Sequence, residues 1–85
     1  MDLHKEYKKK LIFIHDNELI LNDKLKVKII SIIKTNIDDT STIFKHTVGN
    51  TGTTVNMKEI LKIKPEIINN IYSLVHARVV SLSKT

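Results

Sequence analysis

The chain has 85 residues, the size of one domain, so the sequence predicts a single domain over residues 1–85. Its formal net charge is +5 at pH 7, and it has no cysteine, which excludes disulfides, thiolate metal sites and thiol catalysis. Small secreted domains usually need disulfides, so we expect an intracellular location, in the nucleus or the cytoplasm. No apolar run approaches the roughly 20 residues that span a bilayer, so we expect no membrane partner.

The positive charge is carried almost entirely by lysine. Arg78 is the only arginine among 14 basic residues, and isoleucine and asparagine are also heavily used. Codons rich in A and T specify Lys, Ile and Asn, so the composition of the genome accounts for part of the charge. Arginine is the residue that binds phosphates and guanine through two hydrogen bonds. Its scarcity therefore weakens the case for nucleic-acid binding.

Two amphipathic helices are predicted in the first part of the chain. The first covers Leu3–Asp16, and its apolar face consists of Leu3, Tyr7, Leu11 and Ile14, with lysines opposite. The second covers Asp23–Thr35 after an N-cap at Asn22-Asp23, and its apolar stripe consists of Leu25, Ile29, Ile32 and Ile33. Many of these side chains are β-branched, but their spacing still indicates a helix.

A β-hairpin is predicted between residues 43 and 57. Two alternating runs, Ile43–Val48 and Thr53–Met57, flank a segment that contains both glycines, Gly49 and Gly52. Glycine and asparagine accept the positive φ that a tight reversal requires. In the second run, the side chains of Thr53, Val55 and Met57 face one way, and those of Thr54 and Asn56 face the other.

A third helix is predicted over Pro65–Leu82. Pro65 fits the first helical position, where its missing N–H costs nothing, and Ile63 and Ile68 then stand at the two positions of a hydrophobic staple. The predicted fold class is therefore mostly α, a three-helix bundle with a short β-hairpin between helices 2 and 3. An isolated hairpin is not stable, so we expect it to pack on the helices.

The sequence contains no pattern typical of an active site. Its histidines, His4, His15, His46 and His76, have no i, i+3 or i+4 spacing, so we expect no metal, cofactor or catalysis. Adjacent carboxylates point apart, so Asp38-Asp39 is predicted to serve in a turn or cap. The glycine-containing turn lacks the Lys-Ser/Thr that follows a phosphate-binding loop.

Two stretches resemble a known family. Leu21–Lys34 is similar to the second-helix signature of the extra-terminal (NET) domain, the small helical module that follows the bromodomains in bromodomain-and-extra-terminal proteins. Ile63–Val75 is similar to that family's Leu-Lys/Asp-Pro-x-Thr-Leu-x-x-Leu-x-x-Tyr/Phe-Val motif, and Thr54–Met57 stands at the family's short strand. Gly52–Met57 also resembles the Gly-x-x-Ile-Asn-Leu strand of stand-alone modules from large DNA viruses. The resemblance covers about residues 5–76.

The resemblance implies that the protein binds an extended segment of a protein partner by strand addition at the hairpin edge. The expected peptide-binding residues are Ile29, Ile33, Phe44, Thr53, Thr54, Val55, Asn56 and Met57. For Ile29, Ile33, Val55 and Met57, the alternative is that each simply fills the core. Asn56 stands where extra-terminal domains carry an acidic residue that meets lysines of the bound peptide. The segment bound here is therefore expected to depend less on lysines and more on aliphatic side chains.

Two other functions stay open. A nucleic-acid-binding protein would use the lysine faces of the first two helices, which consist of Lys5, Lys8, Lys9, Lys24 and Lys28, and its affinity would fall steeply with salt. A self-assembling viral structural protein would form homo-oligomers through the hairpin edge. For a viral protein the expected location is the virion or the viral factory.

Overall fold

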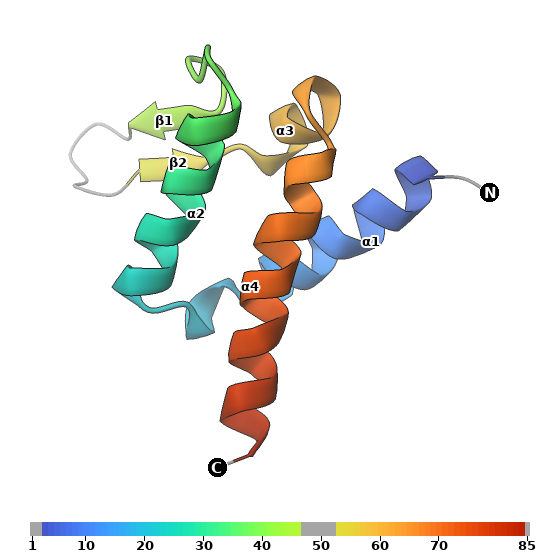
Figure 1. Ribbon diagram of the computed structural model, residues 1–85, viewed down its shortest axis with the longest axis vertical. Helices are drawn as coiled ribbons and strands as arrows, with labels where there is room; N and C mark the ends of the chain where they lie inside the picture. Colours follow the sequence, from blue (N-terminus) through green and yellow to red (C-terminus); the bar gives the residue numbers. More distant parts are fainter. Residues whose placement is uncertain (1–2, 47–52, 85) are drawn as a thin grey trace.

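The computed structural model describes residues 3–46 and 53–84, without the side chains of residues 3, 45, 46, 53 and 54. Within these residues the elements are α1 (Leu3–Asp16), the 3₁₀-helix η1 (Glu18–Ile20), α2 (Asp23–Asn36), β1 (Phe44–His46), β2 (Thr53–Val55), α3 (Met57–Ile63) and α4 (Glu66–Ser83) (Figure 1). The predicted mostly helical class is confirmed. The predicted number of helices is wrong, because the described residues form four α-helices rather than three.

The first two helices follow the sequence prediction closely. Helix α1 has the predicted bounds, and α2 begins at the predicted Asp23 and ends one residue later than predicted, at Asn36. The side-chain oxygen of Asn22 accepts a hydrogen bond of 2.9 Å from the backbone N–H of Leu25. This N-cap satisfies one of the backbone donors that every helix start leaves without an intrahelical partner, and so fixes where α2 begins.

Helix α4 covers Glu66–Ser83. Pro65, directly before it, already has helical dihedral angles, φ −61° and ψ −23°, whereas Lys64 does not, which agrees with the predicted place of Pro65 at the start of the helix. The staple between Ile63 and Ile68 stays a prediction. Ile63 is exposed, and Ile68 is fully buried in the core.

Helix α3 is missing from the sequence prediction. The predicted strand Thr53–Met57 ends at Val55, and Met57 is the first residue of a two-turn helix. Ile60 is fully buried, and Met57 and Leu61 pack against the core beside it. These three residues have i, i+3, i+4 spacing, which places them on one helical face. Burial of that face in the core stabilises a helix too short to be stable by itself.

Strands β1 and β2 pair in antiparallel orientation, with Phe44 opposite Val55, Lys45 opposite Thr54 and His46 opposite Thr53. The backbone N–H of Asn56 extends this ladder by donating to the carbonyl oxygen of Ile43 over 2.7 Å. Strand β2 is shorter than the run predicted for it, and β1 begins one residue later than its predicted run, at Phe44. The turn predicted at residues 49–52 lies outside the described residues and stays a prediction.

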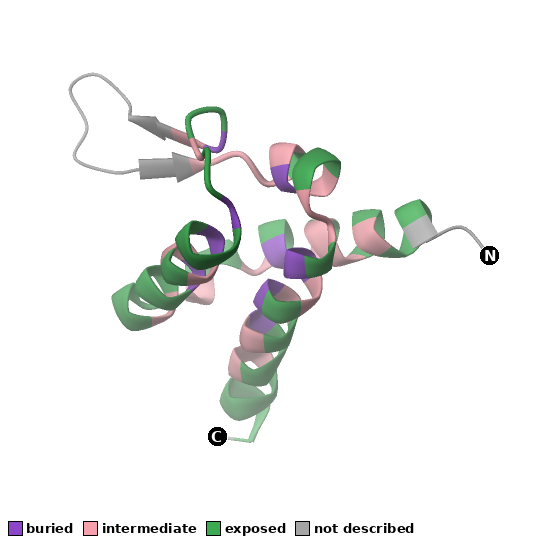
Figure 2. Ribbon diagram, turned by 45° about the horizontal axis from the view of Figure 1, so that its top comes forward, coloured by how far each residue is buried: buried purple, intermediate pink, exposed green. Residues whose placement is uncertain are grey.

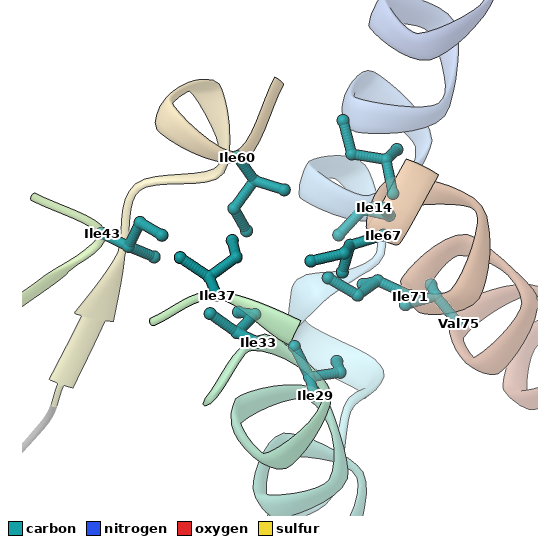
Figure 3. Packing of buried hydrophobic residues seen from close by; sticks show 10 residues of the cluster. Ile14, Ile29, Ile33, Ile37, Ile43, Ile60, Ile67, Ile71 and Val75 are labelled. Atoms are coloured by element: carbon teal, nitrogen blue, oxygen red, sulfur yellow. The ribbon is translucent and has the colours of Figure 1, made fainter. Parts of the chain in front are cut away.

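The core consists almost entirely of isoleucine. Its buried members are Ile14, Ile29, Ile33, Ile37, Ile43, Ile60, Ile67, Ile68, Ile71 and Val75. They come from α1, α2, α3, α4 and the segment between α2 and β2, and Figure 3 shows them converging from these elements. Buried positions gather where the helices approach one another, whereas residues 81–84 at the end of α4 are exposed (Figure 2).

Candidate functional site

An open groove lies between α1, η1, α2 and the junction of β2 with α3. In Figure 1, η1 lies at one end of this space, the β2–α3 junction lies at the opposite end, and α4 crosses α1. Two core residues, Ile14 and Ile29, reach the groove and form its floor, and the fully buried Ile71 lies beneath them. The groove encloses about 1770 Å³, whereas pockets for small ligands usually measure roughly 300–1,000 Å³. Its size therefore suits a polypeptide segment better than a metabolite.

Large apolar side chains line the groove without being covered. Ile12 is 61% exposed and Leu19 is 98% exposed, although both are aliphatic. Leu11, Leu21 and Leu61 are partly buried and continue this apolar surface. A single exposed aliphatic residue is ordinary, but a continuous set along a groove is typical of a binding surface.

The charged residues of the groove are unevenly distributed by sign along its length. Near η1 the groove is lined by Asp16, Glu18 and Asp23, with His15 Nδ1 3.1 Å from a carboxylate oxygen of Glu18, and by a single lysine, Lys26, one turn after Asp23. The side toward α3 is lined by Lys8, Lys58 and Lys62. Lys62 Nζ lies 3.5 Å from a carboxylate oxygen of Glu59, and the lysine side chain is 74% exposed.

The geometry of the β1–β2 ladder determines which backbone groups of β2 face outward. The N–H of Asn56 donates to Ile43, so Asn56 and Ile43 form a hydrogen-bonded pair. Such pairs alternate with non-hydrogen-bonded pairs in antiparallel strands, so Val55 and Phe44 belong to the second kind. The N–H and C=O of Val55 therefore point away from β1, toward the outer edge of β2.

The structure brings four of the eight predicted peptide-binding residues to the groove. These are Ile29, Val55, Asn56 and Met57. Ile33 is fully buried and gives no surface to a partner, so it fills the core, as the alternative interpretation held. Phe44 packs against the core, with Lys34 Nζ 5.8 Å from its ring centre. Thr53 and Thr54 belong to β2, but their side chains lie outside the described part of the structure.

The five lysines of the nucleic-acid hypothesis are not gathered at the groove. Lys8 lines it, whereas Lys5, Lys9, Lys24 and Lys28 are exposed elsewhere on α1 and α2. Lys9 Nζ lies 3.9 Å from a carboxylate oxygen of Glu6, one turn away. Among the described residues that line the groove, none is Phe, Tyr or Trp, and the rings present are the imidazoles of His4 and His15. The groove therefore lacks the large aromatic rings on which bases stack in single-strand-binding proteins.

Phe13, Tyr72 and His76 form an aromatic cluster where α1 packs on α4. The ring centres of Phe13 and Tyr72 are 5.1 Å apart, and His76 stacks on Tyr72 at 5.6 Å. Lys10 Nζ lies 5.6 Å from the Tyr72 ring centre and donates a hydrogen bond to Asn69 Oδ1. These contacts fix the crossing of the two helices, and so the position of the groove wall that α1 provides.

Sequence reasoning missed the contributions of α1, η1 and α3 to the site. Leu11, Ile12, Leu19 and Leu61 line the groove, and none of them was expected to bind a partner. The sequence does contain an indication that Ile12 could bind a partner. It is a large aliphatic residue that lies off the predicted apolar face of α1, which consists of Leu3, Tyr7, Leu11 and Ile14. The sequence contains no such indication for Leu19, because the position of a short 3₁₀ turn depends on tertiary packing.

The possible metal ligands are dispersed over residues 3–46 and 53–84. No group of three or more His, Cys, Asp or Glu side chains there has a geometry that could hold a metal ion. The hydrogen bonds from the backbone and side chain of Ser41 lower the pKa of Asp39, but Asp39 lies in the turn before β1 and not in the groove. The helices of the described residues are all too short or too polar to cross a membrane.

Comparisons of the chain with protein-family models, with curated proteins and with solved structures give no significant match. The geometry of the groove and of the β2 edge is therefore the basis for a functional conclusion.

Proposed function

We propose that this protein is a protein–protein interaction module that binds an extended peptide segment of a partner. The β1 and β2 strands act as a hairpin beside the helical core, and the segment adds a strand at the outer edge of β2. Its apolar side chains continue past Val55 into the groove. The observation that carries the proposal is that the outward N–H and C=O of Val55 stand at the mouth of an apolar groove.

The side of the ladder on which the groove lies supports this mode of binding. Val55, Asn56 and Met57 line the groove, whereas Phe44, the described side chain of β1, and Ile43, directly before that strand, do not. The groove therefore adjoins β2 on the side away from β1, which is where an added strand would lie. Backbone hydrogen bonds would supply register, and the aliphatic floor would supply selectivity by side-chain shape.

The resemblance to extra-terminal domains supports the same proposal independently of the groove, because that family recognises peptides beside its short strand. The residues of the resemblance, Leu21–Lys34 and Ile63–Val75, form most of α2 and the start of α4. Asn56 marks the departure from the family. It is the N-cap of α3, and its side chain makes no capping hydrogen bond.

The proposal can be tested with peptides selected from a displayed random library against the full chain. We expect the selected peptides to alternate aliphatic and other residues, and to shift the backbone amide NMR signals of Val55 and Leu11. Val55→Pro removes the outward N–H, whereas Val55→Ala keeps it and serves as the matched control. We expect the proline variant to lose binding and the alanine variant to retain most of it.

Three results would contradict strand addition. One is that selected peptides bind the proline and alanine variants equally well. Another is that their NMR signals map away from the groove. A third is that the protein alone forms concentration-dependent oligomers that Val55→Pro dissociates, which would support self-assembly through the β2 edge instead.

A further inference from the structure

The groove has charges of opposite sign at its two ends. Along α1, Lys8 and Asp16 are separated by about 12 Å, since eight residues of helix rise about 1.5 Å each. Helix α3 adds Lys58 and Lys62 on the basic side. Near η1, Glu18 and Asp23 add to the acidic side, where the one lysine, Lys26, leaves carboxylates in the majority. This distance corresponds to about four residues of an extended chain, which is short enough for one peptide segment to meet both ends.

These charges are placed to meet a ligand rather than to stabilise the fold. Lys8 and Lys58 are exposed on α1 and α3, and both border the aliphatic surface of Leu11 and Leu61. A charged side chain at the edge of an apolar groove contributes little to folding, because exposed ion pairs are worth roughly 0–1 kcal/mol. It contributes more to the choice of partner, since unlike charges across an interface attract and like charges repel.

Resting on the function proposed above, we infer that the bound segment is dipolar. Its centre is aliphatic, its carboxylates lie at the end that meets Lys8, Lys58 and Lys62, and its lysines or arginines lie at the end that meets Asp16, Glu18 and Asp23. A nucleic acid fits this groove less well. Its phosphates would be repelled at the η1 end, and the aliphatic floor offers the bases no aromatic ring.

Four synthetic peptides test the inference, each with an isoleucine–threonine alternation of about six residues as its centre. Two are dipolar, with glutamates at one terminus and lysines at the other, in the two opposite orders. The third has lysines at both termini, and the fourth has glutamates at both. We expect one dipolar order to bind about threefold to tenfold more tightly than the lysine-only and glutamate-only peptides in fluorescence anisotropy at low salt.

A pair of charge-reversed proteins locates the effect. Lys58→Glu with Lys62→Glu is expected to remove the preference for the dipolar peptide and to improve binding of the lysine-only peptide. Lys24→Glu with Lys28→Glu changes the net charge equally on α2 away from the groove, and serves as the matched control. We expect this control to keep the preference. Circular dichroism melting curves of both variants verify that each is folded.

The outcomes separate the inference from the function on which it rests. Equal affinity for all four peptides, with NMR shifts at Val55 and Leu11, would overturn the dipolar ligand and leave strand addition standing. If both charge-reversed proteins lost the preference for the dipolar peptide to the same extent, the dipolar ligand would also be overturned, because net charge would then explain the preference. Absence of any peptide-induced shift at the groove would overturn both. Binding of a single-stranded oligothymidine to wild type, and loss of that binding in the Lys58→Glu, Lys62→Glu variant, would indicate that the ligand of the groove is a nucleic acid and not a peptide.

Discussion

The Nε–H of Arg78 donates a hydrogen bond of 3.2 Å to the backbone carbonyl oxygen of Ile20. This contact joins α4 to the 3₁₀ turn η1, which carries the fully exposed Leu19 at one end of the groove. The lone arginine of the chain is therefore used to hold a backbone turn. Both residues are half-buried, so the bond is partly shielded from competing water.

We expect Arg78→Met to lower the free energy of unfolding by about 1–2 kcal/mol, because a hydrogen bond from a charged donor is lost and the carbonyl of Ile20 loses its partner. Arg78→Lys should lose a similar amount, since a flexible ammonium group does not reproduce the Nε geometry. Urea unfolding measures both variants. Wild-type stability in either of them would show that the contact does not hold η1 in solution.

Proline substitutions at two adjacent positions should have opposite consequences for stability. The N–H of Asn56 donates into the ladder, so Asn56→Pro should cost about 1–3 kcal/mol relative to Asn56→Ala. The φ of Asn56 is −88°, which lies close to the range of proline, so the lost hydrogen bond is the main cost. The N–H of Val55 points outward, so Val55→Pro should match Val55→Ala closely. Thermal unfolding compares the two pairs, and a large loss in Val55→Pro would show that the outward edge is already in use.

Substitutions of Ile60 test whether α3 depends on the core. Ile60 is fully buried, so Ile60→Val should cost about 0.5–1.5 kcal/mol and Ile60→Ala about 2–5 kcal/mol. A domain of this size has a total stability on the order of 5 kcal/mol, so the alanine variant should retain at most about 3 kcal/mol and unfold at a much lower urea concentration than wild type. Equilibrium urea curves give both values. A folded alanine variant with an unchanged midpoint would mean that α3 is not packed as described.

The turn before β1 gives a prediction for pH dependence. Hydrogen bonds from the backbone and side chain of Ser41 lower the pKa of Asp39 below 3.8 in the folded protein. A lowered pKa means that Asp39 stabilises the fold above its unfolded pKa, and that this contribution is lost as the pH falls through the folded pKa. Asp39→Asn keeps an acceptor for Ser41 but does not titrate. The stability difference between wild type and this variant should therefore shrink on acidification, and an NMR pKa for Asp39 above 3.8 would contradict the assignment.

The long helices could be predicted because each carries its own signals. The apolar spacing of α1 and the cap at Asn22 are local features, and they place the starts of α1 and α2 correctly. Helix α3 could not be separated from the strand before it, because Thr53–Met57 alternates as a strand does. Only the buried position of Ile60 shows that the chain turns helical at Met57.

The candidate site could be predicted only in part, for a related reason. Val55 and Met57 follow from the strand pattern, and Ile29 follows from the stripe of α2. Leu19 and Leu61 come from elements that the sequence did not predict, and the groove exists only once these elements are assembled. Ile33 lies one helical turn after Ile29. Ile33 is fully buried in the core, whereas Ile29 reaches the groove.

The isoleucine-rich core gives the protein a built-in set of spectroscopic reporters. Selective labelling of isoleucine δ1 methyl groups would place a signal in each of the four α-helices. Ile14 and Ile29 reach the groove, whereas Ile33, Ile43, Ile60, Ile67 and Ile68 do not. One methyl spectrum can therefore distinguish a ligand that enters the groove from one that attaches to the outer faces of α1 and α2, without an aromatic probe or an added dye.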